Sequence, residues 1–165
     1  MTPTLFCIAK TQDQARQILN RLRSEGFSVM DTSIVMTKGE GLARIEQEQT
    51  AGKRTGAAAL GAATGGALGI LIGLATFVIP GLEPFLAVGP IVAALADAAA
   101  GGTVGAIAGA LIGMRVSDDK AKFFEEAVKQ GSVLISAHAT DSAKAAIAKR
   151  IFEEHGDEYY PRTNV

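Results

Sequence analysis

The sequence predicts an α+β fold: a ferredoxin-like βαβ repeat with an inserted antiparallel hydrophobic glycine-zipper helical hairpin. Three observations lead to this prediction. Both ends of the chain show the order apolar strand, polar cap, helix and glycine. Residues 55 to 114 contain no lysine or arginine, and glycine recurs there every fourth position in two runs. Two βαβ units make a ferredoxin-like sandwich, and the apolar stretch between them is then an insertion.

Residues 1–37 are the expected first half of the ferredoxin-like domain. The apolar run 3–9 suits a strand, and Thr11 begins a capping-box pattern for the helix that follows. That helix has one apolar face, formed by Ala15, Ile18, Leu19 and Leu22. Gly26 is placed to end the helix, and residues 27–37 suit a second strand.

Residues 115–165 are the expected second half, preceded by one extra helix. Ser117 is a candidate cap for that helix, which should end at Gly131. A strand is expected over 132–139, a helix over 141–155 and a short strand over 157–161. The inward face predicted for the helix over 141–155 consists of Ala143, Ile147 and Ile151.

The inserted hairpin is expected over residues 56–114, behind a polar stem at 38–55. Its helices should cover about 57–79 and 90–112, separated by a proline-rich tip. The glycines expected to mediate helix packing and oligomerisation are Gly61, Gly65, Gly69, Gly73, Gly101, Gly105, Gly109 and Gly113. A hairpin folded about Phe85 brings the two glycine runs face to face.

The length and flanking charges of the hairpin favour a membrane. A helix over 57–79 measures about 34 Å, against roughly 30 Å of hydrocarbon. Lys53 and Arg54 precede the hairpin, Arg115 follows it, and the tip has no positive charge. The positive-inside rule then puts both termini on the cytoplasmic side of the membrane, with lipid as a partner. The alternative is a cytoplasmic assembly in which the hairpin is buried between copies of the chain.

Asp97 is the most suggestive polar residue of the apolar stretch. In the proposed hairpin it faces Gly73 and lies within reach of Thr76, so these residues form a possible intramembrane polar site. A functional interpretation makes Asp97 part of an ion or proton path. A structural interpretation, which we favour, makes it a hydrogen-bonded carboxyl, because no second ionisable group accompanies it.

The remaining chemistry-bearing residues do not form a recognisable catalytic or metal motif. Cys7 has no evident histidine partner, and His138 and His155 lie far apart in the sequence. The string GGTVGA at 101–106 lies inside an apolar helix pattern rather than after a strand, unlike a dinucleotide-binding loop. The net charge of −1 gives no basic field for nucleic acid. We therefore expect neither an enzyme nor a cofactor, and no metal or nucleic-acid partner.

The chain carries, in this order, GAAALGAATGGALGILIG, VGP and AAAGGTVGAIAGALIG, followed by SDDKAKFFEEAVKQG and SVLISAHATDSAKAAIAKRIFEEHG. This order of segments resembles a bacterial family of stress-associated proteins of unknown function, which includes heat-induced general stress and low-temperature-induced proteins. The resemblance implies a role in envelope stress or membrane homeostasis at a bacterial inner membrane, and it brings no catalytic residues.

The sequence thus favours a non-enzymatic, stress-associated membrane protein whose hairpin inserts and forms homo-oligomers below a cytoplasmic ferredoxin-like domain. One alternative is a soluble oligomeric regulatory or ligand-binding module with the hairpin buried in the assembly. Another is a channel or membrane-permeabilising protein in which Asp97 lines the path.

Overall fold

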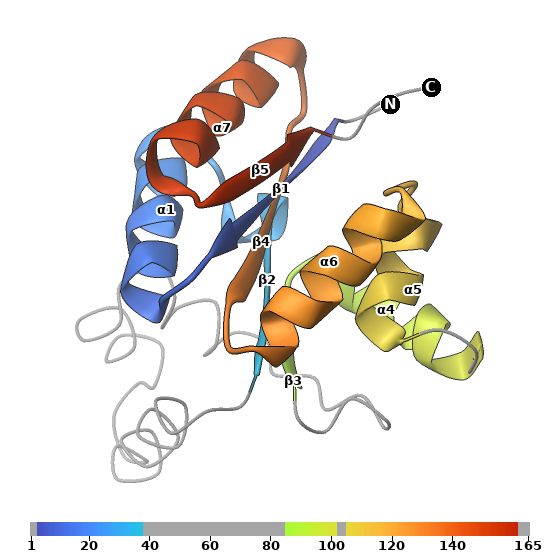
Figure 1. Ribbon diagram of the computed structural model, residues 1–165. Coiled ribbons are helices and arrows are strands. Elements are labelled where there is room, and N and C mark those ends of the chain that lie inside the picture. The colour runs from blue at the N-terminus through green and yellow to red at the C-terminus, as the bar shows by residue number, and fades with distance from the viewer. Residues whose placement is uncertain (1–2, 38–84, 102–104, 162–165) are drawn as a thin grey trace, which may run out of the picture.

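An antiparallel sheet of five strands, with helices on both of its faces, organises the computed structural model (Figure 1). The structure describes residues 3–37, 85–101 and 105–161. The strands are β1 (Thr4–Ala9), β2 (Thr32–Thr37), β3 (Phe85–Val88), β4 (Val133–His138) and β5 (Glu158–Pro161). The helices are α1 (Gln12–Ser24), α4 (Ile91–Gly101), α5 (Ala106–Gly113), α6 (Asp118–Lys129) and α7 (Ser142–His155), with a 3₁₀ turn η1 (Val29–Asp31).

The strand order is β3-β2-β4-β1-β5, and every neighbouring pair is antiparallel. β1 and β2, which α1 connects, are therefore parallel to each other with β4 between them. In the same way, β4 and β5, which α7 connects, are parallel with β1 between them. The two strand–helix–strand units thus interleave in one sheet. The expected mixture of helices and strands is confirmed, and the strands expected at both ends of the chain are present.

Helices α1 and α7 cover one face of the sheet. The four residues predicted as the apolar face of α1 are all buried there. In α7, Ile151 is buried as predicted, together with Ala148 and Phe152. Ile147, also predicted to point inward, is partly buried and packs against the same core. Ala143 is exposed, so its predicted inward position is wrong. The large ring of Phe152 has more apolar surface to bury than the Ala143 methyl group, and the buried face of α7 includes the ring instead.

Helices α4, α5 and α6 cover the other face, so the sheet is buried on both sides. Phe6, Ile8, Val35 and Leu134 point toward these three helices and belong to a second hydrophobic core. β1 is buried along its whole length and β4 along all but its last residue, as expected of strands that are covered on both faces. Apolar residues of α4 and α5 complete this core: Ile91, Leu95, Ile107 and Leu111 are at most 1% exposed.

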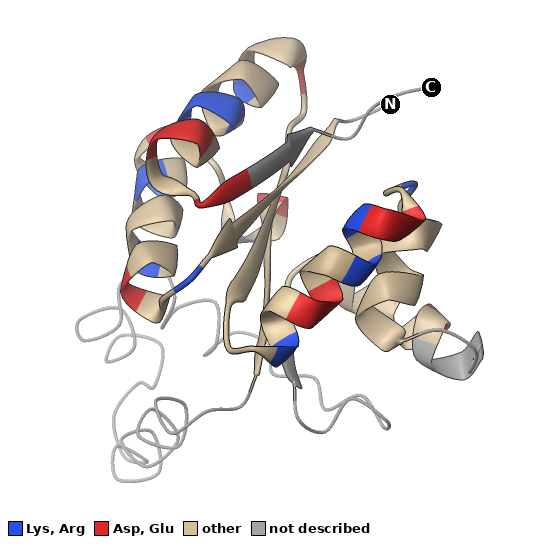
Figure 2. Ribbon diagram, viewed as in Figure 1, with Lys and Arg blue, Asp and Glu red and all other residues tan. Residues whose placement is uncertain are grey.

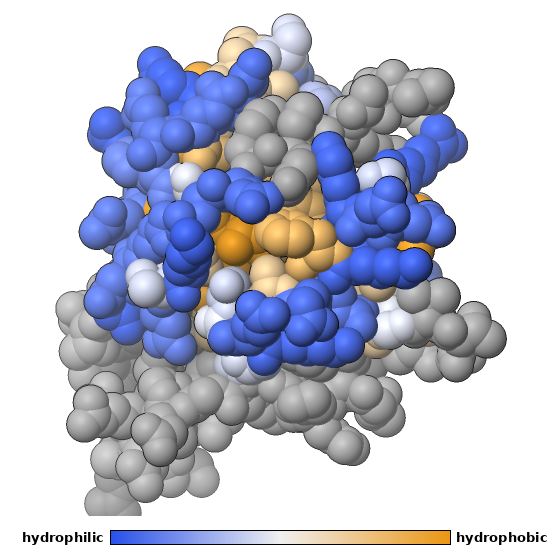
Figure 3. All heavy atoms as spheres, viewed as in Figure 1, coloured by the Kyte–Doolittle hydropathy of each residue, from blue (hydrophilic) through white to orange (hydrophobic). Residues whose placement is uncertain are grey.

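Charged residues are unevenly distributed over the helices. Lysine, arginine, aspartate and glutamate occur on α1, α6 and α7, whereas α5 has none (Figure 2). In the view of Figure 3, hydrophilic residues dominate the two helix layers and hydrophobic residues show between them. Met30 and Phe123 are the exposed large hydrophobic residues within the described parts of the chain. The apolar helices α4 and α5 therefore take part in the core of the same chain.

The structure differs from the expected second half of the hairpin. Part of the expected tip is strand β3, in which Phe85 lies opposite Thr37 of β2. The single helix predicted over 90–112 is not formed, because α4 and α5 are separate helices and Gly105 has extended backbone with φ −48° and ψ 139°. None of the helices in the described ranges is long and apolar enough to cross a membrane. The helix predicted over 57–79 and the stem at 38–55 lie outside the described residues.

The connection between β3 and α4 depends on a glycine. Gly89 has φ +95°, a conformation that residues with a Cβ rarely adopt. A Cβ at this position would also overlap the backbone carbonyl oxygen of Thr32 and crowd Ser33. The chain can therefore turn from β3 into α4 this close to β2 only without a side chain.

We predict that Gly89→Ala destabilises the protein more than Gly131→Ala does. Gly131 has a similar φ of +99°, but nothing lies within 4 Å of a Cβ built there. Gly131→Ala should cost only the left-handed backbone term, about 1–2 kcal/mol. Gly89→Ala adds the overlap with Thr32, and its loss of unfolding free energy in urea should be larger by on the order of 1–3 kcal/mol. Equal losses in the two variants would contradict the close approach.

Candidate functional site

The glycines of the second run meet three different surroundings. Gly101 is the last residue of α4, Gly105 precedes α5, and Gly109 and Gly113 lie within α5. They do not share one continuous helix, so they do not form a single stripe of the kind that the spacing predicts. The first run (Gly61, Gly65, Gly69 and Gly73) and Thr76 lie outside the described residues, and their packing role stays a prediction.

Gly105 admits a carboxylate from another helix. It is the N-cap residue of α5 and has no side chain with which to accept hydrogen bonds. Glu125 of α6 fills this position: its Oε2 accepts a hydrogen bond of 2.7 Å from the Ala108 backbone N–H. A Cβ at Gly105 would overlap the Glu125 carboxylate. Gly105 and Glu125 together thus replace an ordinary Ser or Asp cap, an interaction worth about 1 kcal/mol.

Glu125 is buried and charged, and its environment explains why. Only 8% of the residue is exposed. Burial by itself raises the pKa of this carboxyl, but the hydrogen bond from Lys129 and those from the Ala108 and Ile107 backbone lower it, so that the pKa lies below its ordinary value of 4.5. Lys129 Nζ lies 2.7 Å from Oε1. The positive end of the α5 dipole favours the same negative charge.

Gly109 and Gly113 behave differently from Gly105. A Cβ at Gly109 would lie 3.3 Å from the Cβ of Ala98, so this glycine allows α5 to pack closely on α4 of the same chain. Nothing lies within 4 Å of a Cβ at Gly113, which is exposed. One glycine of the run thus serves packing between helices within the monomer, and another faces open space.

Asp97 lies on the exposed side of α4. The nearby residues of α4 that face the core are Leu95, which is fully buried, and Ala98, which packs against α5. The residues predicted to face Asp97, Gly73 and Thr76, are outside the described ranges. The structure therefore places the carboxyl of Asp97 at the surface of the docked α4 helix, and its intramembrane role stays a prediction.

Three hydroxyl groups surround the His138 ring, an arrangement that the sequence did not predict. Thr4 Oγ1 lies 3.1 Å from Nδ1 of the His138 ring, and Ser33 and Ser136 Oγ lie 3.5 and 3.4 Å from Nε2. Ser33 Oγ also accepts a hydrogen bond from the Ile91 N–H at the start of α4. These residues come from β1, β2 and β4, and no local pattern links them. Alternation along the strands could have shown that they share the sheet face that carries Phe6 and Leu134.

The His138 group resembles a serine–histidine pair but lacks access. Ser33 is 0% and Ser136 is 1% exposed, so a substrate cannot reach either hydroxyl. The imidazole and the hydroxyls instead satisfy one another's hydrogen bonds between the sheet and α4, as buried polar groups must. The group therefore positions α4 and is a weak candidate for catalysis.

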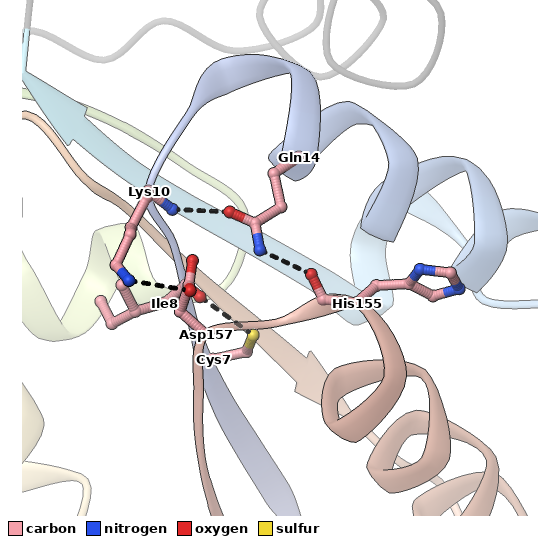
Figure 4. Close-up of polar contacts among 6 residues, drawn as sticks. All are labelled: Cys7, Ile8, Lys10, Gln14, His155 and Asp157. Atoms are coloured by element: carbon pink, nitrogen blue, oxygen red, sulfur yellow. Dashed lines mark hydrogen bonds and ion pairs between the residues drawn. The ribbon is translucent and has the colours of Figure 1, made fainter.

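Cys7 lies in a tightly packed junction between the two halves of the domain (Figure 4). Gln14 bridges them, because its Oε1 accepts from the Lys10 N–H and its Nε2 donates to the His155 carbonyl. Lys10 Nζ also pairs with Asp157 at 3.0 Å, and this hydrogen bond is the main reason that the pKa of Asp157 is lowered. The junction joins the start of α1 to the end of α7.

The thiol of Cys7 is not activated. Burial, with a smaller contribution from the charge of Asp157, raises its pKa to about 12. A reactive cysteine needs a lowered pKa and access to solvent, and Cys7 is 0% exposed. A Cβ at Gly156 would overlap the sulfur, so the thiol fills a close contact there. Within the described ranges, no group of three or more His, Cys, Asp or Glu residues could hold a metal ion.

No family model matches the chain, and comparison with curated proteins and with solved structures gave no match either.

We predict that Glu125→Gln lowers stability in a pH-dependent way. Because the pKa of Glu125 is lowered in the folded protein, its contribution is present above the ordinary pKa and disappears as the pH falls through the folded-state pKa. In urea unfolding at about pH 6, the variant should lose about 1–2 kcal/mol, and this deficit should shrink toward about pH 3.

Glu126→Gln is the matched control for this prediction. Glu126 is the neighbouring residue, is exposed and accepts a hydrogen bond only from the exposed Gln130 among the bonds described. Its unfolding free energy should follow that of the wild type at both pH values. A constant deficit for Glu125→Gln at all pH values would show that the charge of Glu125 has no role.

Proposed function

We propose that the protein is a non-enzymatic assembly module, in which a ferredoxin-like domain presents an apolar, glycine-rich segment to other copies of the chain. Support for the ferredoxin-like assignment comes from the two interleaved strand–helix–strand units, with α1 and α7 on the same face of the sheet. The inaccessible hydroxyls beside His138 and the unactivated thiol of Cys7 favour a role other than catalysis. A role in stress would agree with the resemblance described above.

The pairing of Thr37 with Phe85 is the observation that carries this proposal. β2 ends at Thr37 and β3 begins at Phe85, directly opposite. The chain between them, residues 38–84, therefore joins two neighbouring residues of the sheet. It includes the first glycine run and, between residues 56 and 79, has no charged side chain. This uncharged part, residues 56–79, suits contact with the same part of another copy.

The second half of the apolar region has a partner within its own chain. Ile91, Leu95, Ile107 and Leu111 pack against the sheet and α6, so α4 and α5 need neither lipid nor another copy to cover them. This packing favours the assembly module over the membrane-spanning hairpin. It also limits the expected homo-oligomer contact to the first glycine run.

Membrane insertion by the hairpin is the second candidate, favoured by the lack of lysine and arginine between residues 55 and 114. With β3 paired to β2, however, a helix over 57–79 cannot cross a bilayer. Only the five residues 80–84 remain for the return, and they reach at most about 18 Å against roughly 30 Å of hydrocarbon. Insertion therefore requires β3, α4 and α5 to leave the sheet. A channel with Asp97 in its path has the same requirement.

We predict that Gly65→Leu reduces the oligomer and that Gly113→Leu does not. The leucine at position 65 would enter a close contact between copies, where overpacking costs on the order of 1–3 kcal/mol. Gly113 is the matched control, since its Cβ position is open in the monomer. Sedimentation velocity of the two purified full-length variants distinguishes them. An unchanged distribution for Gly65→Leu would remove the basis of the assembly proposal, and dissociation by Gly113→Leu would move the contact to α5.

We predict that a disulfide joining β2 to β3 leaves the cellular fractionation of the protein unchanged. Val35 and Ala87 are paired residues of these antiparallel strands, and cysteines at such positions have suitable geometry for a disulfide. In Val35→Cys/Ala87→Cys, the oxidised protein cannot release β3. Carbonate extraction of cell membranes should release both the oxidised and the reduced protein into the soluble fraction. Retention of only the reduced form in the membrane would favour the inserted hairpin instead.

A further inference from the structure

Glu125 provides hydrogen-bond acceptors where the apolar stretch departs from a single helix. The sequence pattern over 90–112 favours one helix, yet α5 begins anew after Gly105. The break leaves the first N–H groups of α5 without acceptors in their own helix. Glu125 accepts from Ala108 at 2.7 Å and interacts with the N–H of Ile107 as well.

In one continuous helix these N–H groups would have other partners. The N–H of Ala108 would then bond to the carbonyl of residue 104, and that of Ile107 to the carbonyl of residue 103. The Glu125 carboxylate thus interacts with the two-helix form and has no such role in the one-helix form. Gly105 also favours the two-helix form, because a Cβ at this position would overlap the Glu125 carboxylate that binds the start of α5.

We infer that Glu125 is the residue that holds α4 and α5 as two helices docked on the sheet, and that its removal shifts residues 91–113 toward a single helix that leaves the sheet. A group can shift an equilibrium only by interacting differently with its two states, and Glu125 meets this condition. The inference identifies the regulation of the membrane-inserted form considered above. Its main test uses no membrane and so remains valid if insertion does not occur.

Within the described residues, the charged group that pairs with Glu125 lies on its own helix, α6. Lys129, one helical turn along α6, pairs with Glu125 at 2.7 Å. α5, which packs against Glu125, has no ionisable side chain between Ala106 and Gly113. The charge of Glu125 is therefore balanced by Lys129 and by the start of α5. Release of α5 would leave the ion pair within α6 and remove only the contacts to the α5 backbone.

The first measurement is the rate at which a buried cysteine on α5 reacts with a thiol reagent. Ala110 is 2% exposed, and Ala110→Cys places a thiol in the interface of α5 with the second core. Adding Glu125→Ala to this variant should raise the labelling rate at position 110 by roughly tenfold or more, the lower end of what a hydrogen bond to a charged group contributes. Glu125→Gln, which keeps an acceptor oxygen, should raise it less.

The native Cys7 is an internal control for the overall fold. It is 0% exposed and belongs to the other core, under α1 and α7. Its labelling should stay slow while position 110 reacts, since local release does not open its core. Glu126→Ala is the matched control for the substitution and should leave both rates unchanged. Fast labelling of Cys7 in Glu125→Ala would mean global unfolding, and the comparison then rests on Glu125→Gln.

The second measurement distinguishes one helix from a merely loosened pair. Ala93 and Gly113 are exposed positions on α4 and α5 and can carry spin labels as cysteines. In a continuous helix their Cα atoms lie about 30 Å apart. In the docked form they are closer, because α5 folds back so that Gly109 lies against Ala98. Distances measured by electron paramagnetic resonance should show a new population near this longer value in Glu125→Ala. An unchanged labelling rate, or faster labelling without the long distance, would overturn the inference.

Discussion

The structure depends on one constraint: the central strands β1 and β4 are buried on both faces. A strand that is apolar on one face needs one helix layer, and α1 with α7 provides it. Phe6, Ile8 and Leu134 point the other way and would be exposed without a second layer. Covering them removes a large apolar surface from water, at about 25 cal/mol per Å². This requirement brings α4, α5 and α6 onto the sheet.

The second layer explains how an unusually apolar sequence becomes part of a domain core. α4 and α5 carry alanine, isoleucine, leucine and glycine almost exclusively, a composition that suits lipid as well as a protein interior. What distinguishes the two environments is where the backbone hydrogen bonds go. In the docked form, Glu125 satisfies the start of α5 and Ser33 accepts from the start of α4. The polar residues of this layer therefore bind helix termini of the same chain.

The same polar contacts separate the functional candidates. A docked α4–α5 pair keeps β3 beside β2, the arrangement on which the assembly proposal rests. A released pair would provide the second crossing that a spanning hairpin needs. The hydrogen bond from the Ala108 N–H to Glu125 and the glycine at position 105 belong to the first arrangement. Under the proposals made above, function depends on the free energy of the start of α5.

Much of the domain could be predicted from the sequence alone, because its signals are local. The apolar face of α1, the cap at Thr11, which accepts from the Gln14 N–H, and the left-handed Gly26 that follows the helix are all present as expected. So are the end of α6 before Gly131 and the short strand β5. Each depends on residues within a few positions of one another, which a linear pattern can show.

The candidate site was decided by tertiary contacts. Glycine spacing predicted one helix over 90–112, but Glu125, twenty residues beyond Gly105 in the sequence, makes a break there favourable. The prolines near residues 85–88 indicated a turn in the sequence. These residues form the strand β3 instead, because β2 lies beside them. His138 and its three hydroxyls come from strands far apart in the chain. The sequence by itself determined which segments are apolar and where α1, α6 and α7 start and stop. The tertiary structure decided the break between α4 and α5 and which apolar surfaces meet, because both depend on neighbours that only folding brings together.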